Sequence, residues 1–92
     1  MNIDNAILID VRSDFEYAMG HVEGAKLLDF NSGQFQTAVA TMDKDAEYLL
    51  YCRSGSRAMF AQMIMQRAGI SKVENLGTLE NASRVTGRAI VR

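Results

Sequence analysis

Two short apolar runs constrain the fold of this chain more than any other feature. Residues 6–11 read Ala-Ile-Leu-Ile-Asp-Val, and residues 48–51 read Tyr-Leu-Leu-Tyr between Glu47 and Cys52. A nearly continuous apolar run of this length is typical of a strand that is buried on both faces, and such strands occur in parallel sheets covered by helices. We therefore expect strands at residues 6–11 and 47–52 within a mostly parallel sheet.

Helical and turn patterns separate these strands. Ser13-Asp14-Phe15-Glu16 has the spacing of a capping box, which predicts a short helix through Met19 that ends at Gly20. Further helices are expected at residues 33–42, 57–68 and 79–85. Further strands are expected at residues 24–30 and 72–76, with a minor edge strand at residues 87–91.

The helix predicted at residues 57–68 is rich in methionine. It carries Met59, Met63 and Met65 together with Phe60. Methionine fills irregular space in protein cores, so these side chains are expected to be core residues rather than a ligand-binding stripe. Gly69 follows in the position that favours a left-handed end to a helix.

Strands that alternate with helices place the chain in the α/β class. We expect residues 1–92 to form a single domain, with a mostly parallel sheet of four to five strands flanked by helices on both faces. A hydrophobic fraction of 48% with 23% charged residues is usual for a folded soluble protein. In such sheets, ligand sites lie at the carboxyl ends of the strands.

Charge and the amino-terminal sequence limit the partners and the compartment. A formal net charge of −1 provides no broad cationic field, so nucleic acid is not an expected partner. No apolar stretch is long enough to span a membrane, and no membrane partner is expected. The first five residues lack the basic start of a signal peptide, so the chain as supplied is expected in the cytoplasm, or in the periplasm if a signal peptide has been removed.

Cys52 is the only cysteine, and it lies at the carboxyl end of a predicted strand. One cysteine excludes an internal disulfide and a second thiol that would resolve one. A lone cysteine is often an inert, buried apolar residue. Here the residues that follow it, Arg53-Ser54-Gly55-Ser56-Arg57, are small or cationic, which favours a reactive thiol instead.

The loop after Cys52 has the means to stabilise a negative sulfur. Backbone N–H groups from Ser54 onward and the positive end of the next helix would face the thiolate. Arg53 and Arg57 are candidate anchors for an anionic substrate. For Arg57, a structural tie between the loop and the sheet is an equally good interpretation.

The order of several motifs resembles that of small single-domain rhodaneses. The matching elements are Asp10-Val11-Arg12, Glu16, Gly20-His21-Val22-Glu23-Gly24-Ala25 and the loop Cys52-Arg53-Ser54-Gly55-Ser56-Arg57. Residues 73–77, Val-Glu-Asn-Leu-Gly, also resemble the phage-shock-type members of this family. The resemblance covers most of the chain and implies a rhodanese-like fold.

The resemblance implies a thiosulfate sulfurtransferase that needs no cofactor. Cys52 would be the catalytic residue and would carry a persulfide, while Arg53, Ser54, Gly55, Ser56 and Arg57 would form the loop that binds the anion and the persulfide. The expected partners are a small anionic sulfur donor such as thiosulfate and a thiol or cyanide acceptor. A protein is a further candidate acceptor of the sulfur.

The remaining polar residues of these motifs are expected to be structural. In the family pattern His21 belongs to the turn into the second strand, where it would satisfy local hydrogen bonds rather than act in catalysis. Asp10, Arg12 and Glu16 are expected to form a structural charge network. One histidine and one cysteine do not make a convincing metal site.

Two alternatives remain open. Related phosphatases and arsenate reductases also use a cysteine loop that ends in arginine, but they place one residue more between the two than the four that separate Cys52 from Arg57. The other alternative is a low-turnover sulfur-carrier or interaction module. Thr78 replaces the second glycine usual after the fourth strand, and the tryptophan often found beyond it is absent, so substrate choice is open.

Overall fold

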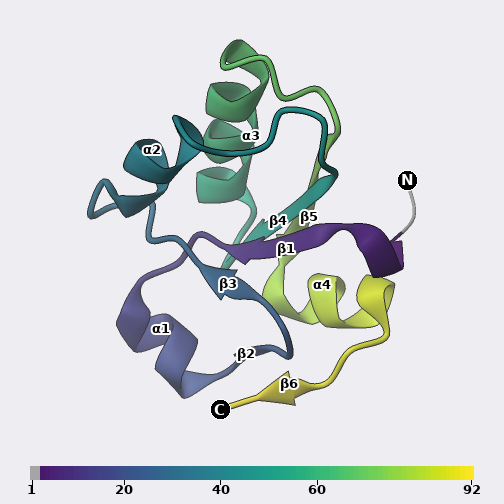
Figure 1. The fold of residues 1–92 in the computed structure, drawn as a ribbon. Coiled ribbons are helices and arrows are strands. Elements are labelled where there is room, and N and C mark those ends of the chain that lie inside the picture. Colours follow the sequence, from purple (N-terminus) through teal and green to yellow (C-terminus); the bar gives the residue numbers. More distant parts are fainter. Residues whose placement is uncertain (1–2) are drawn as a thin grey trace.

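Four parallel strands form the central sheet of a computed structural model that describes residues 3–92 (Figure 1). Met1 and Asn2 of the predicted domain lie outside the described residues. The strand order is β3 (Lys26–Leu27), β1 (Ile7–Asp10), β4 (Tyr48–Cys52) and β5 (Val73–Thr78). The two predicted apolar strands are neighbours, with Ile7 opposite Tyr48 and Asp10 opposite Tyr51. The prediction of a mostly parallel sheet is confirmed.

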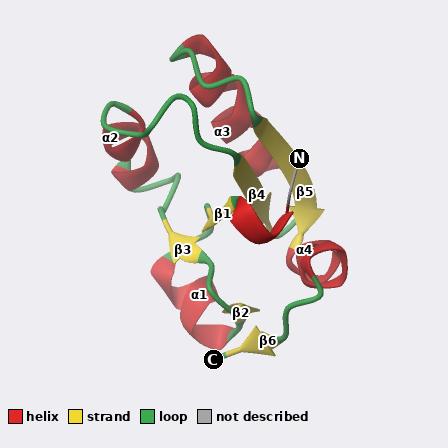
Figure 2. Cartoon of the chain, turned by 45° about the vertical axis from the view of Figure 1, so that its right-hand side comes forward, coloured by secondary structure: helices red, strands yellow, loops and turns green. Residues whose placement is uncertain are grey.

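Helices cover both faces of this sheet, as predicted. A short 3-10 helix, η1 (Ile3–Asn5), precedes β1. The α-helices are α1 (Asp14–Met19), α2 (Gln34–Val39), α3 (Ser56–Arg67) and α4 (Leu79–Thr86). Figure 2 shows α2 and α3 together above the strands, with α1 and α4 below them. The chain is therefore built in three layers, and no helix within residues 3–92 is long and apolar enough to cross a membrane.

The pleat of β4 divides the core into two clusters. Tyr48, Leu50 and Cys52 belong to the cluster beneath α2 and α3. Leu49 and Tyr51 belong to the cluster that includes Ala82 of α4. Because successive side chains of a strand point to opposite faces, Cys52 points toward the α3 layer.

Local signals in the sequence set the helix ends. Ser13 Oγ accepts a hydrogen bond from the Glu16 N–H (3.2 Å), and Glu16 Oε1 accepts one from the Ser13 N–H (3.1 Å), so the capping box is confirmed. Gly69 has a φ of +96° after α3, as expected for a left-handed helix end.

Two elements near residue 30 are shorter than predicted. The strand expected at residues 24–30 is limited to β3, because the Asp29 carboxylate accepts hydrogen bonds from the N–H groups of Asn31 and Ser32 and turns the chain away. The helix expected at residues 33–42 ends at Val39. Beyond it, Thr41 and Met42 donate to carbonyls three residues back, which is a tighter turn than an α-helix.

The edge strand predicted at residues 87–91 does not join the main sheet. Instead β6 (Ile90–Val91) pairs antiparallel with β2 (His21–Val22) in a separate two-stranded sheet. The Glu23 N–H also donates to the Ala89 carbonyl (2.9 Å). The carboxyl-terminal segment thus pairs with the connection between α1 and β3, at the bottom of Figure 1.

The prediction that the methionines and Phe60 of α3 fill the core is wrong for three of the four residues. Only Met65 is buried, whereas Met59, Phe60 and Met63 are 46%, 51% and 42% exposed. The side of α3 that packs on the sheet is narrow and carries Ala58 and Ala61 beside Met65. The larger apolar side chains therefore lie on the opposite side of the helix.

Candidate functional site

Cys52 is the last residue of β4, and its side chain lies beneath the loop that leads into α3. It is fully buried, at 0% exposure. Its Sγ accepts a hydrogen bond from the backbone N–H of Gly55, with 2.9 Å between nitrogen and sulfur. The loop thus directs a backbone donor at the sulfur, in agreement with the geometry expected from the sequence.

Gly55 allows the loop to make this turn. It precedes the first residue of α3 and has a φ of +98°, a left-handed conformation that costs little only for glycine. A Cβ atom at this position would lie 3.4 Å from the Cα of Gly77 on β5. A side chain here would therefore strain the backbone and crowd the neighbouring strand.

Asn75 of β5 holds the loop from the side of the sheet. Its Nδ2 donates to the Gly55 carbonyl (3.1 Å), and its Oδ1 accepts from the Gly77 N–H (2.7 Å). No sequence motif singled out Asn75. The available signal was an amide side chain inside a short predicted strand, where a polar group needs a specific partner.

Arg57 contacts a carboxylate on α1. Its Nη1 and Nη2 donate to Glu16 Oε1 and Oε2 at 2.7 and 3.0 Å. The hydrogen bond from Arg57 lowers the pKa of Glu16 to about 2, and the same contact raises the pKa of Arg57. Cys52 makes a smaller contribution to the rise in the pKa of Arg57, so the guanidinium lies within electrostatic range of the thiol.

This contact favours the structural interpretation of Arg57. The guanidinium uses its bidentate geometry on Glu16, and it ties the start of α3 to α1 rather than to the sheet. Arg53 differs, because its side chain is exposed and makes no hydrogen bond or ion pair within residues 3–92. Ser54 and Ser56 are also exposed, and their hydroxyl oxygens lie 3.1 Å apart.

A buried ion pair lies at the end of β1. Arg12 donates to both carboxylate oxygens of Asp10, through Nε (3.0 Å) and Nη2 (2.7 Å), and also to the Gly20 carbonyl (2.6 Å). The guanidinium carbon lies 5.5 Å from the centre of the Tyr51 ring. The predicted structural role of Asp10 and Arg12 is confirmed, whereas Glu16 pairs with Arg57 instead.

Tyr51 links this ion pair to β2. Its hydroxyl oxygen accepts a hydrogen bond from the Val22 N–H (3.1 Å), and burial raises the pKa of Tyr51. The residue directly before Cys52 is therefore packed in the α4 layer, on the other side of the sheet from the thiol.

His21 makes local contacts, as predicted. Its Nδ1 lies 2.9 Å from the Tyr17 carbonyl oxygen, and its ring stacks on the Tyr17 ring with centroids 3.6 Å apart. Across residues 3–92, no group of three or more histidine, cysteine and carboxylate side chains is arranged to hold a metal ion.

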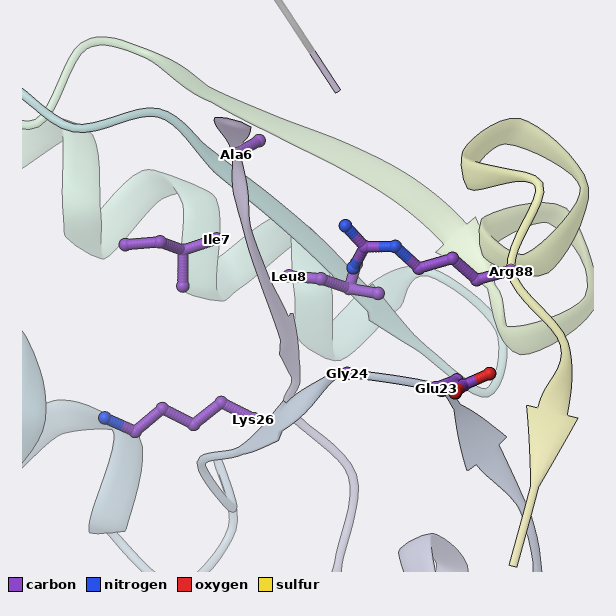
Figure 3. A pocket seen from close by; sticks show the side chains of 7 residues that line it. All are labelled: Ala6, Ile7, Leu8, Glu23, Gly24, Lys26 and Arg88. Atoms are coloured by element: carbon purple, nitrogen blue, oxygen red, sulfur yellow. The ribbon is translucent and has the colours of Figure 1, made fainter. Parts of the chain in front are cut away.

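An open hollow lies beside β1, remote from the carboxyl ends of the strands. Its volume is about 560 Å³, and it is lined by residues of β1, by Glu23, Gly24 and Lys26, and by Arg88. Figure 3 shows the Arg88 side chain reaching across toward Leu8, while the Lys26 side chain extends away from Arg88. Cys52 does not line this hollow.

Comparison with known proteins identifies the family. The family model described as "Rhodanese-like domain" matches residues 1–80. The chain belongs to the rhodanese-like domain family. Thiosulfate sulfurtransferase PspE of Escherichia coli is 33% identical over 73 residues, which cover 79% of this chain and 70% of the relative. The putative sulfurtransferase YtwF of Bacillus subtilis is 38% identical over 66 residues, with 72% of this chain and 62% of the relative covered.

Other relatives are larger proteins. A tRNA uridine(34) hydroxylase of Enterobacter is 35% identical over 86 residues, but the match covers 87% of this chain and only 25% of the hydroxylase. Among solved structures, a rhodanese with anions from E. coli has a TM-score of 0.71 and 32% identity over 83% of this chain and 89% of that one. A rhodanese-like domain from Anabaena shares the fold, with a TM-score of 0.78 at 21% identity over 95% of this chain and 99% of that one.

The rhodanese-like fold brings together most of the loop residues that the sequence singled out. Cys52 and Gly55 are in direct contact, and Ser54 and Ser56 lie beside them. Arg57 is near the thiol but engaged with Glu16, and Arg53 faces solvent. The partners Glu16 and Asn75 come from α1 and β5, 41 and 20 residues away from the loop residues that they contact.

Proposed function

We propose that this rhodanese-like domain is a sulfurtransferase that carries sulfur as a persulfide on Cys52, with thiosulfate as a donor. The observation that carries the proposal is the hydrogen bond from the Gly55 N–H to Cys52 Sγ at the start of a 12-residue helix. A backbone donor and the positive end of a helix both favour negative sulfur, which is the nucleophilic form. Membership of the family and the sulfurtransferase names of two relatives support sulfur transfer in general.

In the first step the Cys52 thiolate attacks the outer sulfur of thiosulfate. A bond forms between Sγ and that sulfur, the sulfur–sulfur bond of the donor breaks, and sulfite leaves with the bonding electron pair. Arg53 would attract the dianion, because its guanidinium has no partner within residues 3–92. Ser54 and Ser56 supply hydroxyl donors on the same loop.

In the second step an acceptor removes the sulfur. A thiolate attacks the outer sulfur of the persulfide, the bond to Sγ breaks, and the Cys52 thiolate is restored. Cyanide would leave as thiocyanate by the same displacement. Because the chain has no second cysteine, the acceptor is another molecule. We propose the cytoplasm as the site of action, since thiols are kept reduced there.

A phosphatase is less well supported by the geometry. Such an enzyme would use the arginine at the end of the loop to hold a tetrahedral anion, but Arg57 makes a bidentate contact with Glu16. Only four residues separate Cys52 from Arg57. The carrier alternative uses the same persulfide and differs only in slow turnover with small donors.

Transfer of a sulfur atom from thiosulfate to Cys52, here called loading, tests the proposal. Incubation with thiosulfate followed by intact mass analysis should show one added sulfur atom in the wild type and none in Cys52→Ser. Addition of cyanide should remove the sulfur and release thiocyanate. Absence of the adduct with thiosulfate and with other sulfane donors would refute sulfur transfer. Phosphate release from an aryl phosphate that depends on Cys52 would support the phosphatase instead.

A further inference from the structure

The solvent-facing side of α3 is apolar next to the Cys52 loop. Met59, Phe60 and Met63 are about half exposed, while Ala61 and Met65 on the other side of the helix are fully buried. A helix with apolar residues on both sides normally packs against a second partner. Clusters of large exposed apolar side chains mark interaction sites in soluble proteins.

The position of these side chains links them to the thiol. The Met59 N–H donates to the Gly55 carbonyl (2.9 Å), and the Gly55 N–H donates to Cys52 Sγ. The cluster therefore begins one helical turn from the loop. At 1.5 Å per residue, the 12 residues of α3 span about 18 Å, starting at the loop. A molecule that lay along α3 would have one end beside Cys52.

Cations stand at both ends of the cluster. Arg53 precedes α3 and Arg67 lies in its last turn, and both are exposed without a hydrogen bond or ion pair within residues 3–92. The helix itself carries no aspartate or glutamate. We call Met59, Phe60 and Met63, with Arg53 and Arg67, the α3 surface.

Glu74 of β5, the strand that packs against α3, does not face the α3 surface. Val73 of β5 packs in the core cluster beneath α3, so its neighbour Glu74 points to the opposite face of the sheet. The α3 surface thus complements a partner with an apolar centre and acidic residues at its ends.

This charge pattern disfavours a second copy of the chain as the occupant. In a symmetric antiparallel pairing of two α3 helices, Arg53 of each copy would lie against Arg67 of the other. Like charges opposite one another weaken an interface. A partner of the opposite charge has no such cost.

We propose that the α3 surface docks a protein that accepts sulfur from Cys52, and that this partner presents a cysteine next to an acidic, apolar segment. The inference rests on the proposed persulfide chemistry. The partner's thiolate attacks the outer sulfur of the Cys52 persulfide, the bond to Sγ breaks, and the persulfide is then on the partner. The outer sulfur lies about 2 Å beyond Sγ, which brings it closer to the incoming thiol.

Synthetic peptides serve as the probe. One peptide carries a single cysteine followed by spaced leucines and glutamates, and the matched peptide has lysine at every glutamate position. The wild type loaded with thiosulfate should transfer sulfur to the acidic peptide at least tenfold faster than to the lysine peptide, as measured by intact mass. Equal rates for the two peptides would overturn the proposal.

Substitutions on α3 test whether the preference for the acidic peptide depends on the α3 surface. The triple substitution Met59→Gln, Phe60→Gln and Met63→Gln should slow transfer to the acidic peptide at least tenfold and leave transfer to 2-mercaptoethanol unchanged. Arg67→Glu should reduce the preference for the acidic peptide. The matched control is Phe15→Gln with Met19→Gln, an exposed apolar pair on α1 that should leave both rates unchanged. An equal loss in this control would overturn the assignment.

Direct binding separates docking from sulfur chemistry. Fluorescence anisotropy of both labelled peptides with the unloaded wild type should show tighter binding of the acidic peptide, whatever the outcome of thiosulfate loading. If Cys52 fails to load but the acidic peptide binds through α3, the proposed function fails and docking stands. Dimerisation, or binding to phosphatidylserine vesicles, that the triple substitution abolishes would assign the surface to another occupant and overturn the proposal.

Discussion

The two arginine–carboxylate pairs of this domain lie in different environments and serve different regions. Arg12 and Asp10 are buried at 5% and 0% exposure and fix the end of β1 to Gly20 and Tyr51. Arg57 and Glu16 are about a quarter exposed and join α3 to α1 beside the Cys52 loop. The first pair belongs to the core, and the second belongs to the site. The difference indicates that stability and loop position can be perturbed separately.

Arg12→Met should have the largest effect. It leaves the Asp10 carboxylate buried without its partner, which typically costs about 3–5 kcal/mol of folding free energy. Urea unfolding followed by circular dichroism would measure the loss. Combining Arg12→Met with Asp10→Asn removes the unpaired buried charge and should recover part of the lost folding free energy. A loss below about 1 kcal/mol for the single variant would show that the pair behaves like a surface pair.

Tyr51→Phe tests the buried region without removing a charge. It leaves the Val22 N–H without its acceptor in a fully buried position, so a loss of about 1–3 kcal/mol is expected. The same urea titration measures it. Persulfide formation on Cys52 should be unchanged under conditions where the variant is folded, and a large fall in its rate would contradict the separation of the two regions.

Asn75→Ala tests the contacts that position the loop. Loss of the hydrogen bond to the Gly55 carbonyl should misplace the Gly55 N–H and slow persulfide formation about tenfold, equivalent to about 1.4 kcal/mol. Single-turnover loading with thiosulfate, followed by mass analysis, gives the rate.

Asn81→Ala is the matched control for this variant. Asn81 also donates its side-chain N–H to a carbonyl of β5, that of Leu76 (2.7 Å), but it makes no hydrogen bond to the loop. The Asn81→Ala substitution should cost similar stability and leave the loading rate unchanged. Parallel changes in both variants would assign Asn75 a purely structural role.

Glu16→Gln should have the smallest effect, and one that depends on pH. The pKa of Glu16 is about 2, below its ordinary value of 4.5, so its ion pair stabilises the fold above pH 4.5 and is lost as the pH falls toward 2. Glutamine retains the capping box but not the charge. Because the pair is partly exposed, we expect a loss of about 1 kcal/mol at pH 7 that disappears near pH 2. Urea unfolding at both pH values would measure this, and a constant difference would contradict an ionic origin.

Local sequence patterns predicted where the helices and strands lie better than they predicted which side chains of a helix face the sheet. The capping box at Ser13 and the apolar strands were readable because their signals lie within a few neighbouring residues. The spacing of apolar residues along α3 did not reveal which of them face the sheet. Small alanines pack closely against the strands, so the larger Met59 and Phe60 are left on the outer side.

The site was predictable in its thiol and loop but not in the groups that hold them. Cys52 and Gly55 are three residues apart, and the composition between them carried the signal. Glu16 and Asn75 meet the loop only after the chain has folded. The pairing of β6 with β2 joins distant segments in the same way, so no local pattern could separate it from an edge strand of the main sheet.

Complete burial of Cys52 also acts as a filter on size. A thiol with no exposed surface reacts slowly with bulky oxidants and alkylating reagents, because they cannot reach the sulfur without movement of the loop. Thiosulfate, the proposed donor, is only a few atoms across and would need a much smaller opening. The same loop that presents a hydrogen-bond donor to the sulfur therefore shields the resting thiol from bulky reagents.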